Sequence, residues 1–257
     1  MVRFLRFEEE PARYEAHTQN ARVWSEGWVA RELYCLNCGA PKLSKVPNNS
    51  PVADFSCSDC AEEYEVKSKA GKIGNRIVDG AYGSMMERLA ADNNPSLVLL
   101  GYDRISKAVT NLAVVPKHFF IADIIQERPP LSPMARRAGW VGCNILLSKV
   151  PEAGKIAVVR NGEVVPKDLV LKRWKQTCFL RDARLVARGW LVEVMKCVED
   201  IGRADFDIAD VYRFEGRMQR LYPGNAHVRE KMRQQLQVLR DEGFIEFLGR
   251  GRYRRPN

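Results

Sequence analysis

Apolar positions in the first two thirds of the chain follow the periods of strands and helices in turn. Residues 64–68 alternate between polar and apolar side chains, and residues 52–56 form a short segment that can pair with them. Residues 96–102 and 111–115 are mostly apolar, as expected of strands that are buried on both faces. This pattern predicts a sheet whose central strands are covered on both sides.

Two helices and one turn complete this region. Residues 79–93 carry apolar side chains three and four positions apart, and residues 13–33 are a second predicted helix. Asn161-Gly162, between residues 155–160 and 164–165, is typical of a two-residue hairpin turn. Helices that precede and separate the strands predict an α/β fold with a mixed sheet.

The pattern changes after residue 182. Predicted helices cover residues 185–201, 206–221 and 226–242, and a hairpin of residues 244–248 and 253–255 follows them. Three helices and a basic hairpin are typical of a winged-helix domain. We therefore expect a first domain of residues 1–182 and a winged-helix DNA-binding domain of residues 183–257.

The third predicted helix of the winged-helix domain has a polar face that includes Arg233, Gln234 and Gln237. In the major groove, glutamine can form paired hydrogen bonds with adenine, and arginine with guanine. Arg250 and Arg252 in the hairpin suit contacts with phosphates. A winged helix can also bind a protein, but the four arginines between residues 250 and 255 favour DNA.

Four cysteines form two Cys-x-x-Cys pairs between residues 35 and 60. Cys35 and Cys38 make the first pair, and Cys57 and Cys60 make the second. Four thiolates satisfy the tetrahedral coordination of zinc and leave no open position, so we predict a structural Zn²⁺. Disulfides are the alternative, but the charged N-terminus does not resemble a signal peptide, and we expect a reducing, cytoplasmic compartment.

A second pattern overlaps the predicted zinc module. Asp54 lies on the first short segment, and Glu65 and Lys67 share one face of the alternating segment. Two carboxylates can hold a catalytic Mg²⁺, with the Val66 carbonyl as a further ligand, and a lysine can orient water during phosphodiester hydrolysis. This pattern of acidic and basic residues is common on solvated strands. The interpretation as a nuclease site therefore depends on its overlap with the predicted zinc module.

Charge and one proline-rich segment point to nucleic acid. The formal net charge of the 257 residues is +9, which suits an acidic partner, and no apolar run reaches the length of about 18 residues that a membrane span needs. After three prolines, Arg136, Arg137 and Trp140 combine phosphate-binding groups with a large apolar surface. Trp140 is therefore a candidate contact to a base edge; anchoring of the segment in the core is the alternative, and the sequence leaves both open.

The arrangement of Asp54 and Glu65-Val66-Lys67 resembles the active site of the PD-(D/E)xK nuclease superfamily, with Ala53 at the position of the proline. Further segments are similar to DpnI-type methyl-directed restriction endonucleases over nearly the whole chain. They are Tyr34-Cys35-x-x-Cys38, Pro51-Val52-Ala53-Asp54-Phe55, Asp79-Gly80-Ala81-Tyr82, Ala91-Asp92-Asn93-Asn94-Pro95, Ala135-Arg136-Arg137-Ala138-Gly139-Trp140 and Glu230-Lys231-x-Arg233-Gln234-Gln235-Leu236-Gln237.

This resemblance implies a restriction-endonuclease-like domain with a zinc module, followed by a winged helix. It implies a monomeric type IIM enzyme that cleaves double-stranded DNA at GATC sites carrying N6-methyladenine, with both domains reading the DNA. With a methylated base as target, Trp140 is the candidate sensor of the methyl group. The superfamily also makes Glu26, on the predicted helix of residues 13–33, a possible auxiliary acid, although a solvated glutamate is the interpretation that the sequence favours. We expect Mg²⁺ in catalysis and Zn²⁺ in the structure. The alternatives are a non-catalytic zinc and winged-helix transcription regulator, which needs no carboxylate–lysine site, and a structure-specific repair nuclease.

Overall fold

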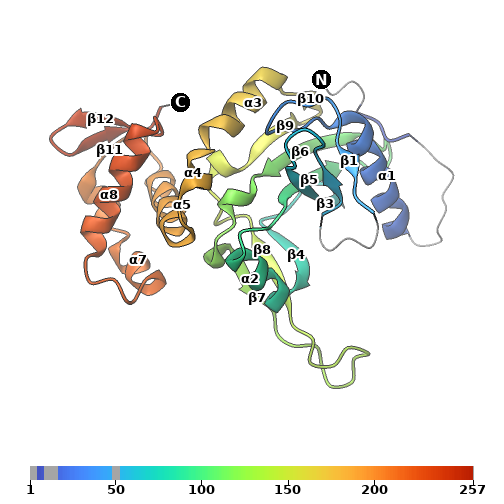
Figure 1. Ribbon diagram of the computed structural model, residues 1–257, viewed down its shortest axis with the longest axis horizontal. Helices are drawn as coiled ribbons and strands as arrows, with labels where there is room; N and C mark the ends of the chain where they lie inside the picture. The colour runs from blue at the N-terminus through green and yellow to red at the C-terminus, as the bar shows by residue number, and fades with distance from the viewer. Residues whose placement is uncertain (1–4, 9–16, 48–52, 257) are drawn as a thin grey trace.

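The computed structural model describes residues 5–8, 17–47 and 53–256 (Figure 1). It has an α/β part, which ends at α4 (Phe179–Asp182), and a smaller, mainly helical part. Among the helices in these ranges, none has both the length and the apolar character that crossing a bilayer requires. The predicted fold class, an α/β domain with a mixed sheet followed by a winged-helix domain, is confirmed.

The main sheet of the described residues has seven strands in the order β1-β2-β3-β5-β6-β9-β10. The strands are β1 (Ser44–Lys45), β2 (Phe55–Ser56), β3 (Glu63–Ala70), β5 (Ser96–Tyr102), β6 (Val109–Val115), β9 (Ile156–Arg160) and β10 (Glu163–Val164). Strands β3 and β5 are parallel, and the other neighbours are antiparallel. The sheet is therefore mixed, as the sequence predicts.

Several predicted strands agree with the structure. The pairing of residues 52–56 with 64–68 is present as β2 and β3, although β2 is shorter and Val52 lies outside the described residues. The hairpin between β9 and β10 turns at Asn161 and Gly162, whose φ angles of 50° and 79° are the left-handed values that such a turn requires.

The main sheet is buried on both faces. Val98 and Leu100 of β5 pack in one hydrophobic core with α1 (His17–Glu32) and α3 (Lys167–Gln176), whereas Leu97 and Leu99 pack in a second core on the opposite face. Two-sided burial explains why β5 is an unbroken apolar run. Helix α1 agrees with the helix predicted at 13–33 from residue 17 to residue 32. Residues 13–16 of that prediction lie outside the described residues.

A small antiparallel sheet lies on the side of the second core, with the order β4-β8-β7. Its strands are β4 (Arg76–Ala81), β7 (Ile125–Glu127) and β8 (Gly142–Leu146), and α2 (Tyr82–Ala90) follows β4. The predicted helix at residues 79–93 is therefore wrong at its start, because Asp79 and Gly80 belong to β4. Pairing with β8, which is more than 60 residues away in the chain, sets this strand and cannot be seen in the local pattern.

The C-terminal part is a winged helix. It contains α5 (Leu185–Asp200), β11 (Asp205–Asp207), α6 (Ile208–Tyr212), α7 (Glu215–Leu221), α8 (Val228–Asp241), β12 (Glu246–Gly249) and β13 (Arg252–Arg254). Asp207 caps α6 in a reciprocal pair with Asp210, as an N-cap at this position should. The single helix predicted at residues 206–221 is wrong: Phe206 pairs with Tyr253 in a sheet of order β11-β13-β12, and the helix breaks before Glu215.

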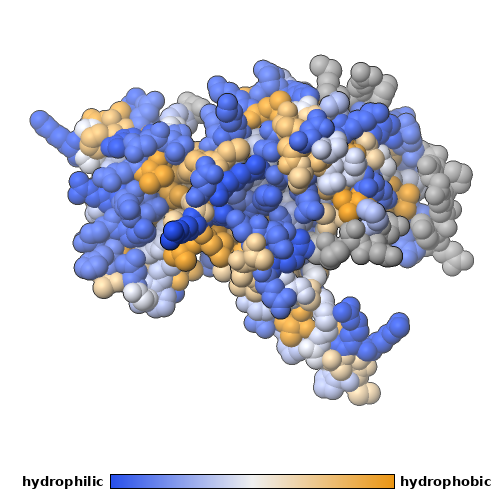
Figure 2. Space-filling model, viewed as in Figure 1, coloured by the Kyte–Doolittle hydropathy of each residue, from blue (hydrophilic) through white to orange (hydrophobic). Residues whose placement is uncertain are grey.

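Helix α5 joins the two parts of the molecule (Figure 1). Its residues Trp190 and Val194 are buried in the same hydrophobic core as Leu97 and Leu99 of the main sheet. Hydrophilic residues cover most of the face shown in Figure 2, including the arm that projects from the body. This arm comprises residues 128–141, which connect β7 to β8.

Candidate active site

Strand β3 presents Glu65 and Lys67 on the face that is turned toward the small sheet. In the parallel register, Glu65 lies beside Leu97 and Lys67 beside Leu99, and both leucines belong to the core on that side. Lys67 Nζ lies 2.6 Å from Glu65 Oε1. The structure therefore brings together two of the three predicted catalytic side chains.

Asp79 is a third member of this group that the sequence analysis missed. Lys67 Nζ donates a hydrogen bond of 2.7 Å to Asp79 Oδ1, and the Asp79 side chain is only 7% exposed. Strand β4 places it there. The signal that could have found it is the strand-like alternation of residues 76–81, which the predicted helix obscured.

Asp54 lies directly before β2, next to the backbone of β3. Its Oδ2 accepts a hydrogen bond of 2.7 Å from the Val66 amide, and its Oδ1 lies 3.2 Å from Arg22 Nη2. The carboxylate is thus held beside the residue that separates Glu65 from Lys67. Within the described ranges, Asp54, Glu65 and Asp79 do not form a compact group of three metal ligands.

Electrostatics distinguish the members of the group. Burial by itself would lower the pKa of Lys67, but the charges of Glu65 and Asp79 outweigh it and raise the pKa, so the ammonium stays protonated. Burial raises the pKa of Glu65, and the charges of Asp79 and Asp54 add to this effect while Lys67 opposes it. Three carboxylates and one ammonium leave an excess of negative charge, and carboxylate oxygens are hard donors of the kind that Mg²⁺ prefers.

Glu26 is neither solvated nor isolated, which corrects the interpretation that the sequence favoured. It is buried, and Oε1 lies 2.5 Å from Arg22 Nε while Oε2 lies 2.7 Å from Lys45 Nζ. Burial would raise the pKa of Glu26, but hydrogen bonds from Lys45 and Arg22 lower it overall. Because Arg22 also contacts Asp54, this arginine connects Glu26 with the candidate site.

The four predicted zinc ligands form one cluster, the only group of its kind in the described part of the chain. The sulfurs of Cys35 and Cys60 are 3.6 Å apart, and those of Cys38 and Cys57 are 3.5 Å apart. A tetrahedral zinc ion with Zn–S bonds of about 2.3 Å requires a separation of about 3.8 Å between sulfurs. The cluster therefore fits a structural zinc ion.

Both cysteine pairs share one backbone geometry. The Gly39 amide donates to the Cys35 carbonyl and the Ala61 amide to the Cys57 carbonyl, each over 2.9 Å. Gly39 and Ala61 have positive φ angles of 80° and 56°. A glycine adopts this conformation without a steric penalty, which explains its presence after Cys38.

The projecting arm carries Arg136 and Arg137 in exposed positions. Trp140 lies at its base: the Arg137 guanidinium is 4.8 Å from the centre of the Trp140 ring, and a Cβ at position 142 would lie 2.7 Å from the indole. Trp140 belongs to neither hydrophobic core of the described residues. The indole therefore supports the arm, and the expected alternative, anchoring in the core, is not observed. The apolar side chain at the arm's outer turn is Met134, which is 94% exposed.

Helix α8 separates its two faces as the sequence predicts. Met232 and Leu236 are buried, and Arg233, Gln234 and Gln237 are exposed. Arg250 occupies the turn between β12 and β13 with a positive φ of 50°, and Arg252 begins β13; both are exposed. These two groups of side chains form a polar and basic surface on the winged helix.

Comparison with protein families covers almost the whole chain. The model of the Dam-replacing family, DpnI, matches residues 5–183, and the model of the Dam-replacing HTH domain matches residues 186–255. The first match contains the carboxylate–lysine group and the cysteine cluster, and the second contains α8. The chain therefore belongs to the Dam-replacing family of DpnI-type proteins and is a restriction endonuclease with a C-terminal helix-turn-helix DNA-binding domain.

Proposed function

We propose that this endonuclease cleaves double-stranded DNA at GATC sites that carry N6-methyladenine, by Mg²⁺-dependent hydrolysis of the phosphodiester bond. The observation that carries the proposal is the half-buried contact of Lys67 with Glu65 and Asp79, beside Asp54, in a chain of the DpnI family. A DNA-binding regulator has no use for such a group of charges, which must be desolvated to be buried together.

Asp54 and Glu65 would hold Mg²⁺ through carboxylate oxygens, and the Val66 carbonyl would be a further ligand. A bound Mg²⁺ polarises the scissile phosphate and lowers the pKa of a water molecule. Lys67, which its neighbours keep protonated, would orient the attacking water and stabilise the negative charge of the transition state. Asp79 is a positioning residue in this scheme, because it contacts Lys67 and fixes the direction of the ammonium group.

Two separate surfaces would contact the duplex. Arg136 and Arg137 on the arm would bind phosphates, and Trp140, which supports the arm, would place an apolar surface beside the adenine methyl group in the major groove. On the winged helix, the exposed residues of α8 would read bases, and the two arginines of the hairpin would bind phosphates; these residues are Arg233, Gln234, Gln237, Arg250 and Arg252.

We further propose that the domains are residues 1–182 and 183–257, and that the enzyme acts as a monomer. The two family matches, which meet between residues 183 and 186, support this division. A structural zinc ion bound by four thiolates suits a reducing, cytoplasmic setting. When one of the two domains has bound the DNA, the local concentration of the site is higher for the other domain.

The decisive experiment compares two preparations of one plasmid, adenine-methylated and unmethylated, incubated with the protein and Mg²⁺. Discrete fragments from the methylated plasmid alone support the proposal. Absence of cleavage in both preparations would indicate a non-catalytic regulator. Cleavage of both preparations, or of branched DNA only, would indicate a repair nuclease.

Lys67→Ala should abolish cleavage and leave DNA affinity nearly unchanged, because the lysine acts on the transition state and not on the bound duplex. Cleavage of methylated plasmid and an electrophoretic mobility shift with the same DNA measure the two effects. Lys72→Ala is the matched control, since Lys72 is exposed in the turn after β3. Loss of DNA binding in Lys67→Ala would mean that the lysine has a structural role.

A further inference from the structure

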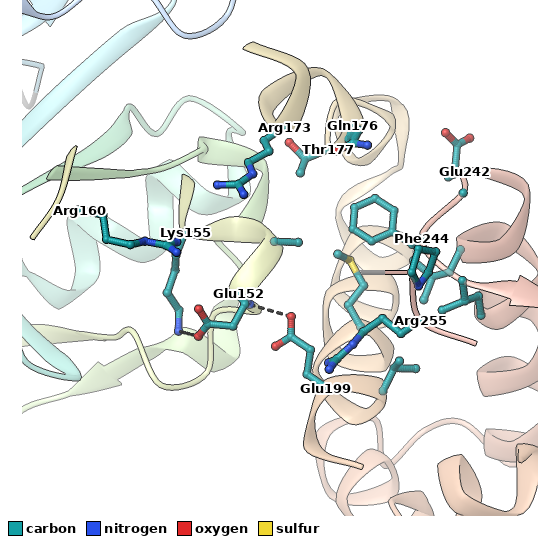
Figure 3. A pocket seen from close by; sticks show the side chains of 17 residues that line it. Glu152, Lys155, Arg160, Arg173, Gln176, Thr177, Glu199, Glu242, Phe244 and Arg255 are labelled. Atoms are coloured by element: carbon teal, nitrogen blue, oxygen red, sulfur yellow. Dashed lines mark hydrogen bonds and ion pairs between the residues drawn. The ribbon is translucent and has the colours of Figure 1, made fainter. Parts of the chain in front are cut away.

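A cleft of about 520 Å³ separates the α/β part from the winged helix (Figure 3). One wall consists of residues from β9, α3 and the turn η3 (Glu152–Gly154), and the other consists of residues from α5, the end of α8 and the C-terminal tail. None of the lining residues belongs to the carboxylate–lysine group or to the polar face of α8. The proposed function therefore leaves this cleft without a role.

Three arginines line the cleft. Arg160, at the end of β9, and Arg173, on α3, extend from one wall, and Arg255, after β13, extends from the other (Figure 3). In the part of the chain that the structure describes, none of these three guanidinium groups forms an ion pair or a side-chain hydrogen bond. Guanidinium groups that face a shared space and have no ion-pair partner favour an anion there.

The acidic side chains of the cleft do not neutralise these arginines. Glu152 pairs with Lys155 over 2.6 Å, and Glu199 Oε1 accepts a hydrogen bond of 2.7 Å from the Glu152 amide. Burial raises the pKa of Glu199, and a hydrogen bond from the Glu152 amide opposes this effect. Glu242 lies at the rim and points away from the arginines (Figure 3).

The floor of the cleft is apolar. Met195 and Val198 of α5 and Leu239 of α8 are buried, and Phe244 is half-buried beside them. The Phe244 ring lies between the two walls (Figure 3), and its centre is 5.4 Å from that of Phe179. An aromatic ring on an apolar floor can stack against a planar heterocycle.

We propose that this cleft binds a nucleoside phosphate. Its base would rest on Phe244 and the apolar floor, and its phosphate would lie between Arg160 and Arg173. The volume is within the range of small-molecule sites, and planar guanidinium groups match phosphate oxygens in pairs. The ligand is either a free nucleotide or the terminal nucleotide of a single strand, since both have this chemistry.

A ligand that touches both walls binds only when the winged helix is docked as observed. Binding should therefore raise the thermal stability of the full chain and favour one arrangement of the two domains. This effect is separate from DNA cleavage, because the lining residues are distinct from the catalytic group. Failure of the cleavage proposal would leave the nucleotide proposal untouched.

The test uses the full-length protein without added Mg²⁺, with binding measured by calorimetry and by the shift in unfolding temperature. ATP should raise the unfolding temperature, and Arg160→Gln and Arg173→Gln should each weaken its binding about tenfold or more. Arg104→Gln, an exposed arginine outside the cleft, is the matched control, and Lys67→Ala should bind ATP like the wild type. A 5′-phosphorylated tetranucleotide that binds more tightly than ATP identifies a DNA end as the ligand; the reverse order identifies a free nucleotide.

Three results would overturn the proposal. The first is the absence of binding of both ATP and the tetranucleotide at millimolar concentration. The second is equal affinity in the wild type and in the two arginine variants. The third is equal affinity for pyrophosphate and ATP together with no effect of Phe244→Leu, which would show that the cleft holds an anion but no base. Thermal unfolding without ligand confirms that Phe244→Leu is folded.

Discussion

At the scale of single residues, the contacts of Lys67 determine the charge that it brings to catalysis. The charges of Glu65 and Asp79 raise its pKa against the opposing effect of burial. Asp79→Asn removes one of these charges, so the pKa of Lys67 should fall relative to the wild type. We expect roughly 10- to 100-fold slower cleavage, as for other residues that orient groups at a metal site. The alkaline limit of the rate should also move to lower pH, because Lys67 then loses its proton earlier.

The pH–rate profile of single-turnover cleavage measures both effects. Glu87→Gln, which removes an exposed charge from α2, is the control and should keep the profile of the wild type. An unchanged rate and an unchanged alkaline limit in Asp79→Asn would show that Asp79 does not position Lys67.

At the scale of elements, the cysteine cluster and strand β2 form a unit, because Asp54 precedes β2 and Cys57 follows it. Loss of zinc should therefore displace Asp54 as well as loosen the loop. Cys57→Ser should lose bound zinc, unfold the α/β part and lose cleavage, since binding of structural zinc contributes to the free energy of folding. Metal analysis and circular dichroism measure the result.

Cys178→Ala is the control for this substitution, because Cys178 lies outside the cluster; its sulfur contacts the Trp174 carbonyl, and its side chain packs at the edge of the core. It should keep the zinc and the activity of the wild type. A folded, active Cys57→Ser protein would refute the zinc assignment.

At the scale of the whole molecule, Arg188 of α5 ties the winged helix to the α/β part. Its guanidinium is buried, pairs with both carboxylate oxygens of Asp92 at 2.5 and 2.9 Å, and donates to the carbonyls of Leu180, Arg181 and Ala183. Arg188→Met should lower the free energy of unfolding by roughly 1–3 kcal/mol, because it leaves the carbonyls of Leu180, Arg181 and Ala183 without this donor. Asp92→Asn should cost less, since the Asp92 side chain is 57% exposed.

Urea unfolding of both variants provides the comparison. Equal losses in the two variants would mean that the ion pair, and not the carbonyl contacts of Arg188, fixes the docking of α5.

A second contact between the domains should make stability depend on pH. Glu193 of α5 is buried near Asp123, Oε1 has no hydrogen-bond partner among the described residues, and Oε2 lies 2.6 Å from Arg217 Nη2. Burial raises the pKa of Glu193 to about 7; Arg217 opposes the shift, and Asp123, which is itself paired with Lys149, adds to it. The folded state thus holds a proton that the unfolded state has released above pH about 4.3.

The contribution of Glu193 to stability should therefore fall as the pH rises from about 4.5 to 7, because the unfolded state binds fewer protons there. We expect the free energy of unfolding of Glu193→Gln to decrease less steeply with pH across that range than that of the wild type. The other groups near Glu193, including Tyr222 and Cys197, are the same in the variant, so the difference between the two slopes reports Glu193. An identical slope in the wild type and Glu193→Gln would contradict the assignment.

The sequence by itself determined those features that depend on neighbours in the chain. The spacing of Cys35, Cys38, Cys57 and Cys60 predicts their cluster, because a tight turn in each pair brings its two thiols together. Alternation places Glu65 and Lys67 on one face of β3, and the helical period separates the two faces of α8. In each case the side-chain direction follows from local backbone geometry alone.

Only the tertiary structure decided the contacts that join distant segments. Asp79 reaches Lys67 because β4 pairs with β8, and the helix predicted from residue 79 could not show that pairing. Likewise, Phe206 lies in a strand and not in the predicted helix, because it pairs with Tyr253. The cleft and the Arg188 contacts exist because α5 packs against both parts of the molecule. Strand pairing and burial of shared apolar surface across long sequence separations made these choices, and a local period contains no information about them.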